Sequence, residues 1–139
     1  MNRVTQQRVL VGKLGDMAKT VLIVDDHEDL RHILASILRF SGYEILEAGT
    51  GTQAIEKAVA AKPNLILLDL DLPDITGIDA ARVIKKNPTT ANIPIVACSA
   101  LSGWEWREEA LRAGMVAYME KPLSAPVIEA TIKQFILPN

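Results

Sequence analysis

Hydrophobic residues along the chain alternate between short uninterrupted runs and longer stretches with helical spacing. The short runs predict five β-strands, at residues 21–24, 43–48, 64–69, 93–99 and 115–119. The periodic stretches predict five helices, at residues 30–38, 53–61, 79–86, 105–113 and 127–136. Residues 64–69 form the most apolar strand, which indicates a central position covered on both faces. This alternation predicts an α/β fold with a doubly wound, five-stranded parallel sheet.

Composition agrees with a globular domain and argues against several classes of protein. A chain of 139 residues with 49% hydrophobic and 23% charged residues is too apolar to be intrinsically disordered. The net charge of −2 argues against binding nucleic acid by bulk electrostatics. No apolar run exceeds five residues and no signal sequence opens the chain, so we expect a cytoplasmic protein without a membrane span. The single cysteine, Cys98, excludes an internal disulfide and is interpreted as a small buried hydrophobic residue.

The first residues differ in charge from the rest, and we divide the chain into an N-terminal extension at 1–18 and a domain at 19–139. The extension has three basic residues and one acid, which gives a net charge of +2. Because Met17 stands directly before the first strand, two interpretations stay open. The segment is either a genuine extension, helical over residues 4–14, or the result of a misassigned translation start.

Polar side chains gather where the predicted strands end. Carboxyl ends of neighbouring parallel strands meet at one edge of a sheet, and ligands bind there beside a switch in strand order. The residues at these ends are Asp25, Asp26, Asp69, Asp71, Ser99 and Lys121. Taken singly, the acids could cap helices and the lysine could lie in a solvated turn.

Taken together, these residues favour a bound cation. Several carboxylates at one edge repel one another unless a cation lies among them. Oxygen ligands without a set of histidines and cysteines favour Mg²⁺ over zinc. A lysine and a hydroxyl beside such an ion would suit the oxygens of a phosphoryl group.

Four fragments, in this order, resemble the receiver domain of two-component response regulators. They are residues 22–26 (Leu-Ile-Val-Asp-Asp), 67–73 (Leu-Leu-Asp-Leu-Asp-Leu-Pro) followed by Gly77, 97–100 (Ala-Cys-Ser-Ala) and 118–122 (Tyr-Met-Glu-Lys-Pro). The resemblance covers nearly all of the chain outside the N-terminal extension. It implies a flavodoxin-like (βα)5 fold with strand order 2-1-3-4-5.

The resemblance also implies roles for the residues at the strand ends. Asp69 would accept a phosphoryl group from a phosphohistidine on a histidine kinase or a phosphotransfer protein. Mg²⁺ would be held by Asp25, Asp26 and Asp69 and by the backbone carbonyl of Asp71. Lys121 would pair with Asp69 and later with a phosphoryl oxygen.

By the same resemblance, Ser99 and Tyr118 would form a switch. Ser99 would hydrogen-bond another phosphoryl oxygen, and the ring of Tyr118 would swing inward as Ser99 moves. This rearrangement would alter the face formed by residues 105–113, 115–119 and 127–136. That face could bind a downstream effector protein or a second copy of the chain.

Trp104 and Trp106 stand two residues apart at the start of the predicted fourth helix. Residues with this spacing point about 200° apart, so both rings cannot face the core together. We expect at least one to be exposed to a partner, the alternative being that one packs inward and the other covers the loop. His27 and His32 are interpreted as surface residues, and His27 could line the mouth of the site.

The sequence therefore predicts a phosphoacceptor protein that catalyses only its own phosphorylation and dephosphorylation and is not otherwise an enzyme. Two alternatives stay open. One is a Mg²⁺-dependent phosphohydrolase with Asp69 as nucleophile and Asp71 as acid, although the chain leaves little room for a cap that encloses a substrate. The other is a receiver fold that binds partners without being phosphorylated.

Overall fold

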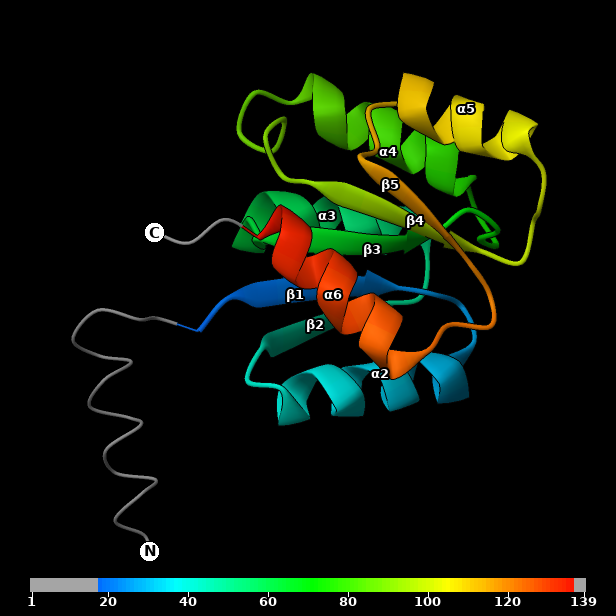
Figure 1. Ribbon diagram of the computed structural model, residues 1–139. Helices are drawn as coiled ribbons and strands as arrows, with labels where there is room; N and C mark the ends of the chain where they lie inside the picture. Colours follow the sequence, from blue (N-terminus) through cyan, green and yellow to red (C-terminus); the bar gives the residue numbers. More distant parts are fainter. Residues whose placement is uncertain (1–17, 137–139) are drawn as a thin grey trace, which may run out of the picture.

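The computed structural model describes residues 18–136, which build a parallel sheet with helices on both faces (Figure 1). The strands are β1 (Thr20–Val24), β2 (Glu44–Ala48), β3 (Leu65–Asp69), β4 (Ile95–Ser99) and β5 (Ala117–Glu120). The helices are α2 (Glu28–Phe40), α3 (Gly51–Ala61), α4 (Gly77–Lys86), α5 (Trp104–Arg112) and α6 (Ala125–Phe135). The strand order is β2-β1-β3-β4-β5 with every pair parallel, which confirms the predicted flavodoxin-like fold.

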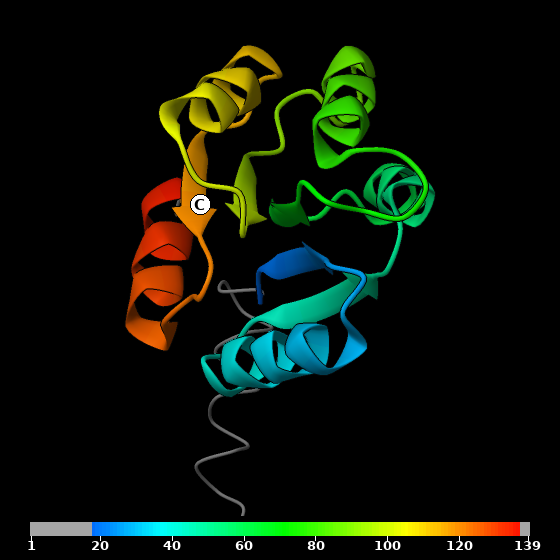
Figure 2. The same ribbon diagram turned by 90° about the vertical axis from the view of Figure 1, so that its right-hand side faces the viewer.

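Two hydrophobic cores lie on opposite faces of the sheet. Helices α2 and α6 cover one face, and α3, α4 and α5 cover the other (Figure 2). Alternate residues of β3 serve both cores: Leu65 and Leu67 pack in the α2–α6 layer, and Ile66 and Leu68 in the α3–α4–α5 layer. All four are buried, because the central strand of a doubly wound sheet has no solvent face. This explains why the β3 sequence is apolar without alternation.

The last strand begins later in the chain than the hydrophobic pattern predicts. The pattern indicates a strand over residues 115–119, whereas β5 runs over Ala117–Glu120. The backbone N–H of Met115 donates to the carbonyl of Ala110 at 3.0 Å, and Gly114 has a φ of +97°. This left-handed glycine closes α5 and leaves the buried Met115 in the turn that follows the helix.

The predicted N-terminal extension, residues 1–18, lies outside the described residues except for Ala18, and so does its possible helix over residues 4–14. The sheet and its helices therefore all lie within the predicted domain, of which residues 19–136 are described. Within residues 18–136, no helix is both long enough and apolar enough to cross a membrane.

Candidate functional site

The carboxyl ends of β1 and β3 bring two aspartates together. β1 lies between β2 and β3, so the chain turns to opposite sides of the sheet after β1 and after β3. Asp69 is the last residue of β3. Asp25 follows β1, and its N–H donates to the carbonyl of Ala48 at the end of β2, at 3.0 Å. Both aspartates are only 3% exposed, so two buried carboxylates meet at the switch in strand order.

Lys121 joins these two carboxylates. Its backbone N–H donates to the carbonyl of Ser99 at 2.8 Å, which continues the β4–β5 pairing past the end of β5. Its Nζ donates to Oδ2 of Asp25 at 2.8 Å and to Oδ2 of Asp69 at 3.1 Å. The lysine side chain is 15% exposed, so the ammonium shares the pocket of the carboxylates. The structure thus brings three of the predicted site residues into one ion-paired group.

Burial and ion pairing shift the pKa values of these three side chains in opposite directions. Burial raises the pKa of Asp69 above its usual value, and its hydrogen bonds and the charge of Lys121 offset this only in part. Burial also raises the pKa of Asp25, but hydrogen bonds from Lys121 and His27 outweigh it and hold this pKa below its usual value. Burial lowers the pKa of Lys121, yet its carboxylate partners raise it further, so the lysine stays charged. With Asp26 alongside, one ammonium faces three carboxylates, and a further cation is favoured.

The residues present fit a Mg²⁺ ion. Ligand atoms of Asp25, Asp26, His27 and Asp69 all lie within 4.8 Å of one another. The N–H of Asp71 donates to Oδ1 of Asp69 at 3.1 Å, so the loop after β3 begins beside this carboxylate. Mg²⁺ binds oxygen, and it takes one or two carboxylates while keeping several waters.

His27 lies beside the acid pair, at the mouth of the site, where the sequence analysis allowed for it. Its side chain is 71% exposed, as expected of a surface residue, but Nδ1 lies 3.1 Å from Oδ1 of Asp25 and 3.2 Å from Oδ1 of Asp26. The backbone N–H of His27 also donates to Oδ1 of Asp25, at 2.8 Å. His32, in contrast, pairs with Glu47 of β2, with Nε2 3.4 Å from Oε1. The adjacency of aspartate and histidine is visible in the sequence, but the direction of the ring is not.

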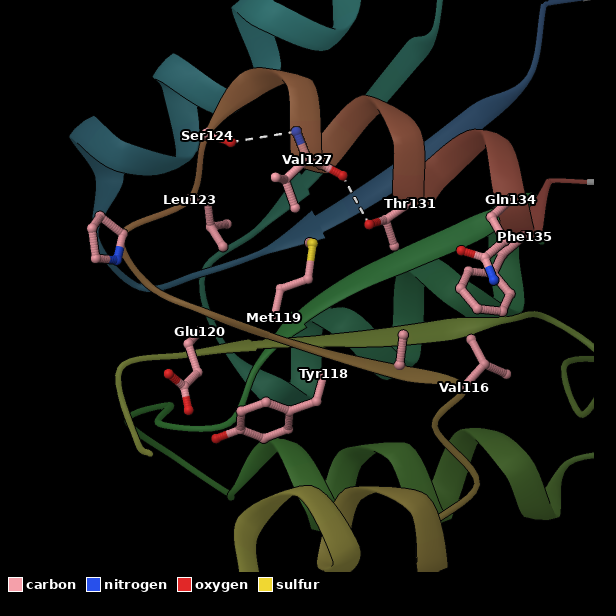
Figure 3. A pocket seen from close by; sticks show the side chains of 12 residues that line it. Val116, Tyr118, Met119, Glu120, Leu123, Ser124, Val127, Thr131, Gln134 and Phe135 are labelled. Atoms are coloured by element: carbon pink, nitrogen blue, oxygen red, sulfur yellow. Dashed lines mark hydrogen bonds between the residues drawn. The ribbon is translucent and has the colours of Figure 1, made fainter. Parts of the chain in front are cut away.

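Ser99 and Tyr118 meet through the backbone of Leu101, a residue that sequence reasoning missed. Ser99 is fully buried, and its Oγ accepts a hydrogen bond from the N–H of Leu101 at 3.0 Å. The hydroxyl of Tyr118 donates to the carbonyl of Leu101 at 2.6 Å. Tyr118 is 8% exposed, and its ring points away from α6 toward the α5 side of the sheet (Figure 3). The guanidinium of Arg107 lies 5.2 Å from the centroid of this ring. The loop between β4 and α5 is thus bonded both to the end of β4 and to a ring on β5.

Two cavities flank this part of the molecule. One of about 590 Å³ lies between β5 and α6, where Met119 and Val127 are among the lining residues (Figure 3). The other, of about 390 Å³, lies between α4 and α5 and is lined in part by Asp71, Leu101 and Trp106. The second cavity therefore reaches from the loop after β3 to Trp106 of α5.

The remaining sequence predictions concern two tryptophans and a cysteine. Trp104 is 65% exposed and Trp106 is 39% exposed, which confirms that at least one ring faces solvent. Cys98 is buried in the α2–α6 core, and burial raises its thiol pKa to about 12. The interpretation of Cys98 as a small hydrophobic residue is therefore confirmed.

Asp74 ties the β3–α4 loop to the start of α3. Its Oδ1 accepts from the N–H of Gly51 at 2.8 Å, and its Oδ2 accepts from the N–H and the hydroxyl of Thr52 at 2.9 Å and 2.6 Å. The N-cap residue Thr50 accepts from the N–H of Gln53, so Asp74 serves the other donors of that helix end. These hydrogen bonds, led by the Thr52 hydroxyl, lower the pKa of Asp74 below its usual value.

Replacement of Asp74 by alanine is expected to loosen the β3–α4 loop and to weaken Mg²⁺ binding. The variant frees the loop that carries the Asp71 carbonyl and leaves two N–H groups of α3 without their acceptor. Thr50→Ala is the matched control, because it removes a cap from the same helix without touching the loop. Thermal unfolding should show a lower Tm in both variants, and calorimetric titration should show weaker Mg²⁺ binding in Asp74→Ala alone. Equal Mg²⁺ affinities in the two variants would contradict the expectation.

The difference in stability between wild type and Asp74→Ala should also depend on pH. Because the pKa of Asp74 is lower in the folded chain, its contribution to stability is present above its usual pKa of about 4 and is lost as the pH falls. The Tm difference between wild type and Asp74→Ala should therefore narrow on acidification. A difference that stays constant would show that the carboxylate charge does not matter at this position.

Comparison with known proteins decides the family. Residues 21–133 match the response regulator receiver domain. The chain belongs to the response regulator receiver family. The receiver domain is 32% identical to the polar-differentiation response regulator DivK of Brucella anthropi over 120 residues, which cover 86% of this chain and 98% of DivK. It is 39% identical over 117 residues to the phosphate regulon transcriptional regulatory protein PhoB of Pseudomonas aeruginosa; these cover 84% of this chain but only about half of PhoB, 51%.

Solved structures of receiver domains share this fold. The receiver domain of the sensor histidine kinase PA1611 from Pseudomonas aeruginosa PAO1, with a magnesium ion coordinated in its active site cleft, has a TM-score of 0.80 and 28% identity, over 86% of this chain and 98% of that one. A CheY-like receiver domain protein from Methanospirillum hungatei JF-1 has a TM-score of 0.79 and 29% identity, over 84% and 92%. The acidic cluster of Asp25, Asp26 and Asp69 is typical of the Mg²⁺-binding site of receiver domains. Such domains act in two-component signalling and are typically not catalytic enzymes.

Proposed function

We propose that this receiver domain accepts a phosphoryl group on Asp69 from a phosphohistidine of a histidine kinase or a phosphotransfer protein. The observation that carries the proposal is the position of Lys121 Nζ, 2.8 Å from Asp25 and 3.1 Å from Asp69, beside the acidic cluster. Membership of the family implies a histidine kinase as partner. Asp25, Asp26, Asp69 and the backbone carbonyl of Asp71 would hold Mg²⁺.

The residues of the site account for the transfer chemically. A carboxylate oxygen of Asp69 attacks the phosphorus, the P–N bond of the phosphohistidine breaks with its electron pair leaving on the imidazole, and an acyl phosphate forms. An anionic nucleophile approaches an anionic phosphoryl group only where positive charge reduces their repulsion. Lys121 supplies an ammonium within hydrogen-bond distance of Asp69 and can donate to a phosphoryl oxygen. Bound Mg²⁺ would supply further positive charge to the carboxylates and phosphoryl oxygens.

The signal would leave the site through Leu101. The acyl phosphate places roughly −2 of charge where Asp69 carried −1, which attracts the hydroxyl of Ser99. Movement of Ser99 changes its hydrogen bond to the Leu101 N–H, and the carbonyl of Leu101 is the acceptor of the Tyr118 hydroxyl. The switch would then alter the surface formed by α5, β5 and α6, where an effector protein or a second copy of the chain would bind.

Mass spectrometry after incubation with acetyl phosphate tests the proposal. Wild type should gain one phosphoryl group (about 80 Da) only when Mg²⁺ is present, and Asp69→Asn should gain none. Failure of wild type to gain the group and to bind beryllofluoride would indicate a domain that only binds partners. A group that is still added to Asp69→Asn would place the phosphoacceptor elsewhere. Multiple turnover of a phosphate ester would instead favour the phosphohydrolase alternative.

The two exposed tryptophans are expected to lie in the partner surface. Trp104→Ala and Trp106→Ala should each weaken self-association of the beryllofluoride-treated domain about tenfold or more, since buried tryptophans often dominate an interface. Val83→Ala is the matched control, because Val83 is an exposed hydrophobic residue on α4, outside the α5–β5–α6 surface. Analytical ultracentrifugation measures the association. A monomeric wild type, or equal dimerisation in all three variants, would contradict the expectation.

A further inference from the structure

The phosphotransfer chemistry makes no use of His27, although this side chain lies at the mouth of the pocket. Its Nδ1 is 3.1 Å from Oδ1 of Asp25 and 3.2 Å from Oδ1 of Asp26. His27 occupies the N-cap position of α2, yet its side chain makes no cap hydrogen bond. The ring is therefore directed at the acid pair and not at the end of the helix.

The distances from Nδ1 of His27 to the oxygens of Asp25 and Asp26 also match the distances between neighbouring ligand atoms on a metal ion. With bonds of about 2.1 Å, two ligands lie about 3.0 Å apart in octahedral geometry and about 3.4 Å apart in tetrahedral geometry. The nitrogen of His27 and the oxygens of Asp25 and Asp26 already fall in this range, and Asp69 completes the same four-residue group within 4.8 Å. Because the side chain is 71% exposed, the ring has room to turn as an ion enters.

We infer that His27 is a nitrogen ligand for late first-row transition-metal ions such as Ni²⁺, Co²⁺ and Zn²⁺ in this pocket. Imidazole nitrogen binds these ions well, whereas Mg²⁺ prefers oxygen and gains little from an imidazole. His27 therefore determines which divalent ion the pocket prefers, separately from the chemistry at Asp69. The inference rests on the proposed function, since the same aspartates hold the ion in both.

Calorimetric titration of the untagged full chain with NiCl₂ and with MgCl₂ tests the inference. His27→Ala should weaken Ni²⁺ binding about tenfold or more and leave Mg²⁺ binding within about twofold of wild type. His32→Ala is the matched control, because His32 is the other histidine of the chain and pairs with Glu28 and Glu47 instead. It should leave both affinities unchanged. Asp26→Asn should weaken both ions, which would place Ni²⁺ in this pocket.

The visible absorption of bound Co²⁺ gives a second readout that does not depend on affinity. A nitrogen ligand shifts the bands of Co²⁺, so the spectrum of His27→Ala should differ from those of wild type and His32→Ala. An unchanged spectrum and Ni²⁺ affinity in His27→Ala, or an equal loss of Ni²⁺ and Mg²⁺ binding, would overturn the inference. Undiminished Ni²⁺ binding in Asp26→Asn would also overturn it, because the ion would then lie elsewhere.

Failure of the proposed function would look different from failure of this inference. In that case wild type would gain no phosphoryl group from acetyl phosphate in the presence of Mg²⁺, whatever the metal titrations show. A wild type that is phosphorylated normally, combined with a His27→Ala variant of unaltered metal preference, would leave the proposed function standing and remove only the role of His27.

Discussion

Lys121→Met is expected to lower the rate of phosphorylation by acetyl phosphate about 100-fold at saturating Mg²⁺, which is the usual cost of removing one charge-stabilising donor from an active site. The Lys121 ammonium lies 3.1 Å from Oδ2 of Asp69 and is mostly buried, so water does not replace it without rearrangement of the pocket. Methionine keeps the length and apolar packing of the side chain while removing its charge. The loss of rate should therefore arise in the chemical step, in molecules that have kept the native packing around residue 121.

The affinity for Mg²⁺, unlike the phosphorylation rate, should not fall in Lys121→Met. The Lys121 ammonium repels a second cation in the same pocket, so Lys121→Met should bind Mg²⁺ as tightly as wild type or more tightly. Phosphorylation rates followed by mass spectrometry and Mg²⁺ titration by calorimetry measure the two effects on one sample. Lys86→Met, at an exposed lysine of α4, is the control for loss of a positive charge. A phosphorylation rate within about threefold of wild type would remove Lys121 from the transfer step.

The stability of Lys121→Met should also depend on pH, because of the two buried carboxylates. In wild type, hydrogen bonds from Lys121 and His27 keep the pKa of Asp25 below its usual value despite burial. Without the ammonium, burial would raise the pKa values of Asp25 and Asp69 together, which destabilises the fold wherever both are ionised. Protonation relieves that penalty as the pH falls through the raised values. The stability lost in Lys121→Met, measured by urea unfolding, should thus be largest near neutral pH and shrink on acidification.

The part of the site that sequence reasoning predicted is the part that strand polarity determines. In a parallel sheet all strands end at one edge, so a residue that ends a strand or directly follows it has a known location once the strand is recognised. Asp69 and Ser99 end their strands, and Asp25 and Lys121 directly follow theirs. In the structure Lys121 donates to both aspartates. The apolar sequence of β3 supplied the remaining constraint, because only a central strand is apolar on both faces.

The part that was missed depends on contacts that no sequence period encodes. Asp74 bonds to α3 across more than twenty residues of chain, and the ring of His27 takes its direction from a side-chain torsion. The carbonyl of Leu101 is found as the acceptor of Tyr118 only when the loop path is known. The late start of β5 did have a signal, because Gly114 comes two residues after the end of α5 and has the positive φ of a left-handed turn.

Gly77→Ala is expected to reduce the free energy of unfolding by about 3 kcal/mol or more, at the upper end for overpacking substitutions. A Cβ at Gly77 would lie 2.2 Å from the carbonyl oxygen of Asp69 and 2.7 Å from the Cα of Leu70. Neither atom can move like the end of a flexible side chain, because Asp69 ends the central strand and the N–H of Gly77 is bonded to the carbonyl of Leu70 at 2.9 Å. Relief of the clash must displace α4 from the strand that carries Asp69, the proposed phosphoacceptor.

Gly42→Ala separates this effect from the general cost of replacing a glycine. Gly42 has a φ of +101° at the end of α2, but a Cβ there would meet nothing within 4 Å. Its replacement should cost only about 1–2 kcal/mol of backbone strain and leave phosphorylation intact. Gly77→Ala should lose phosphorylation as well as stability, even at low temperature where the variant is folded, because the clash falls on Asp69 itself. Urea unfolding followed by circular dichroism, with phosphorylation measured by mass spectrometry, compares the two variants. A smaller stability loss in Gly77→Ala than in Gly42→Ala, or normal phosphorylation of Gly77→Ala, would mean that the close approach of α4 to β3 does not position Asp69.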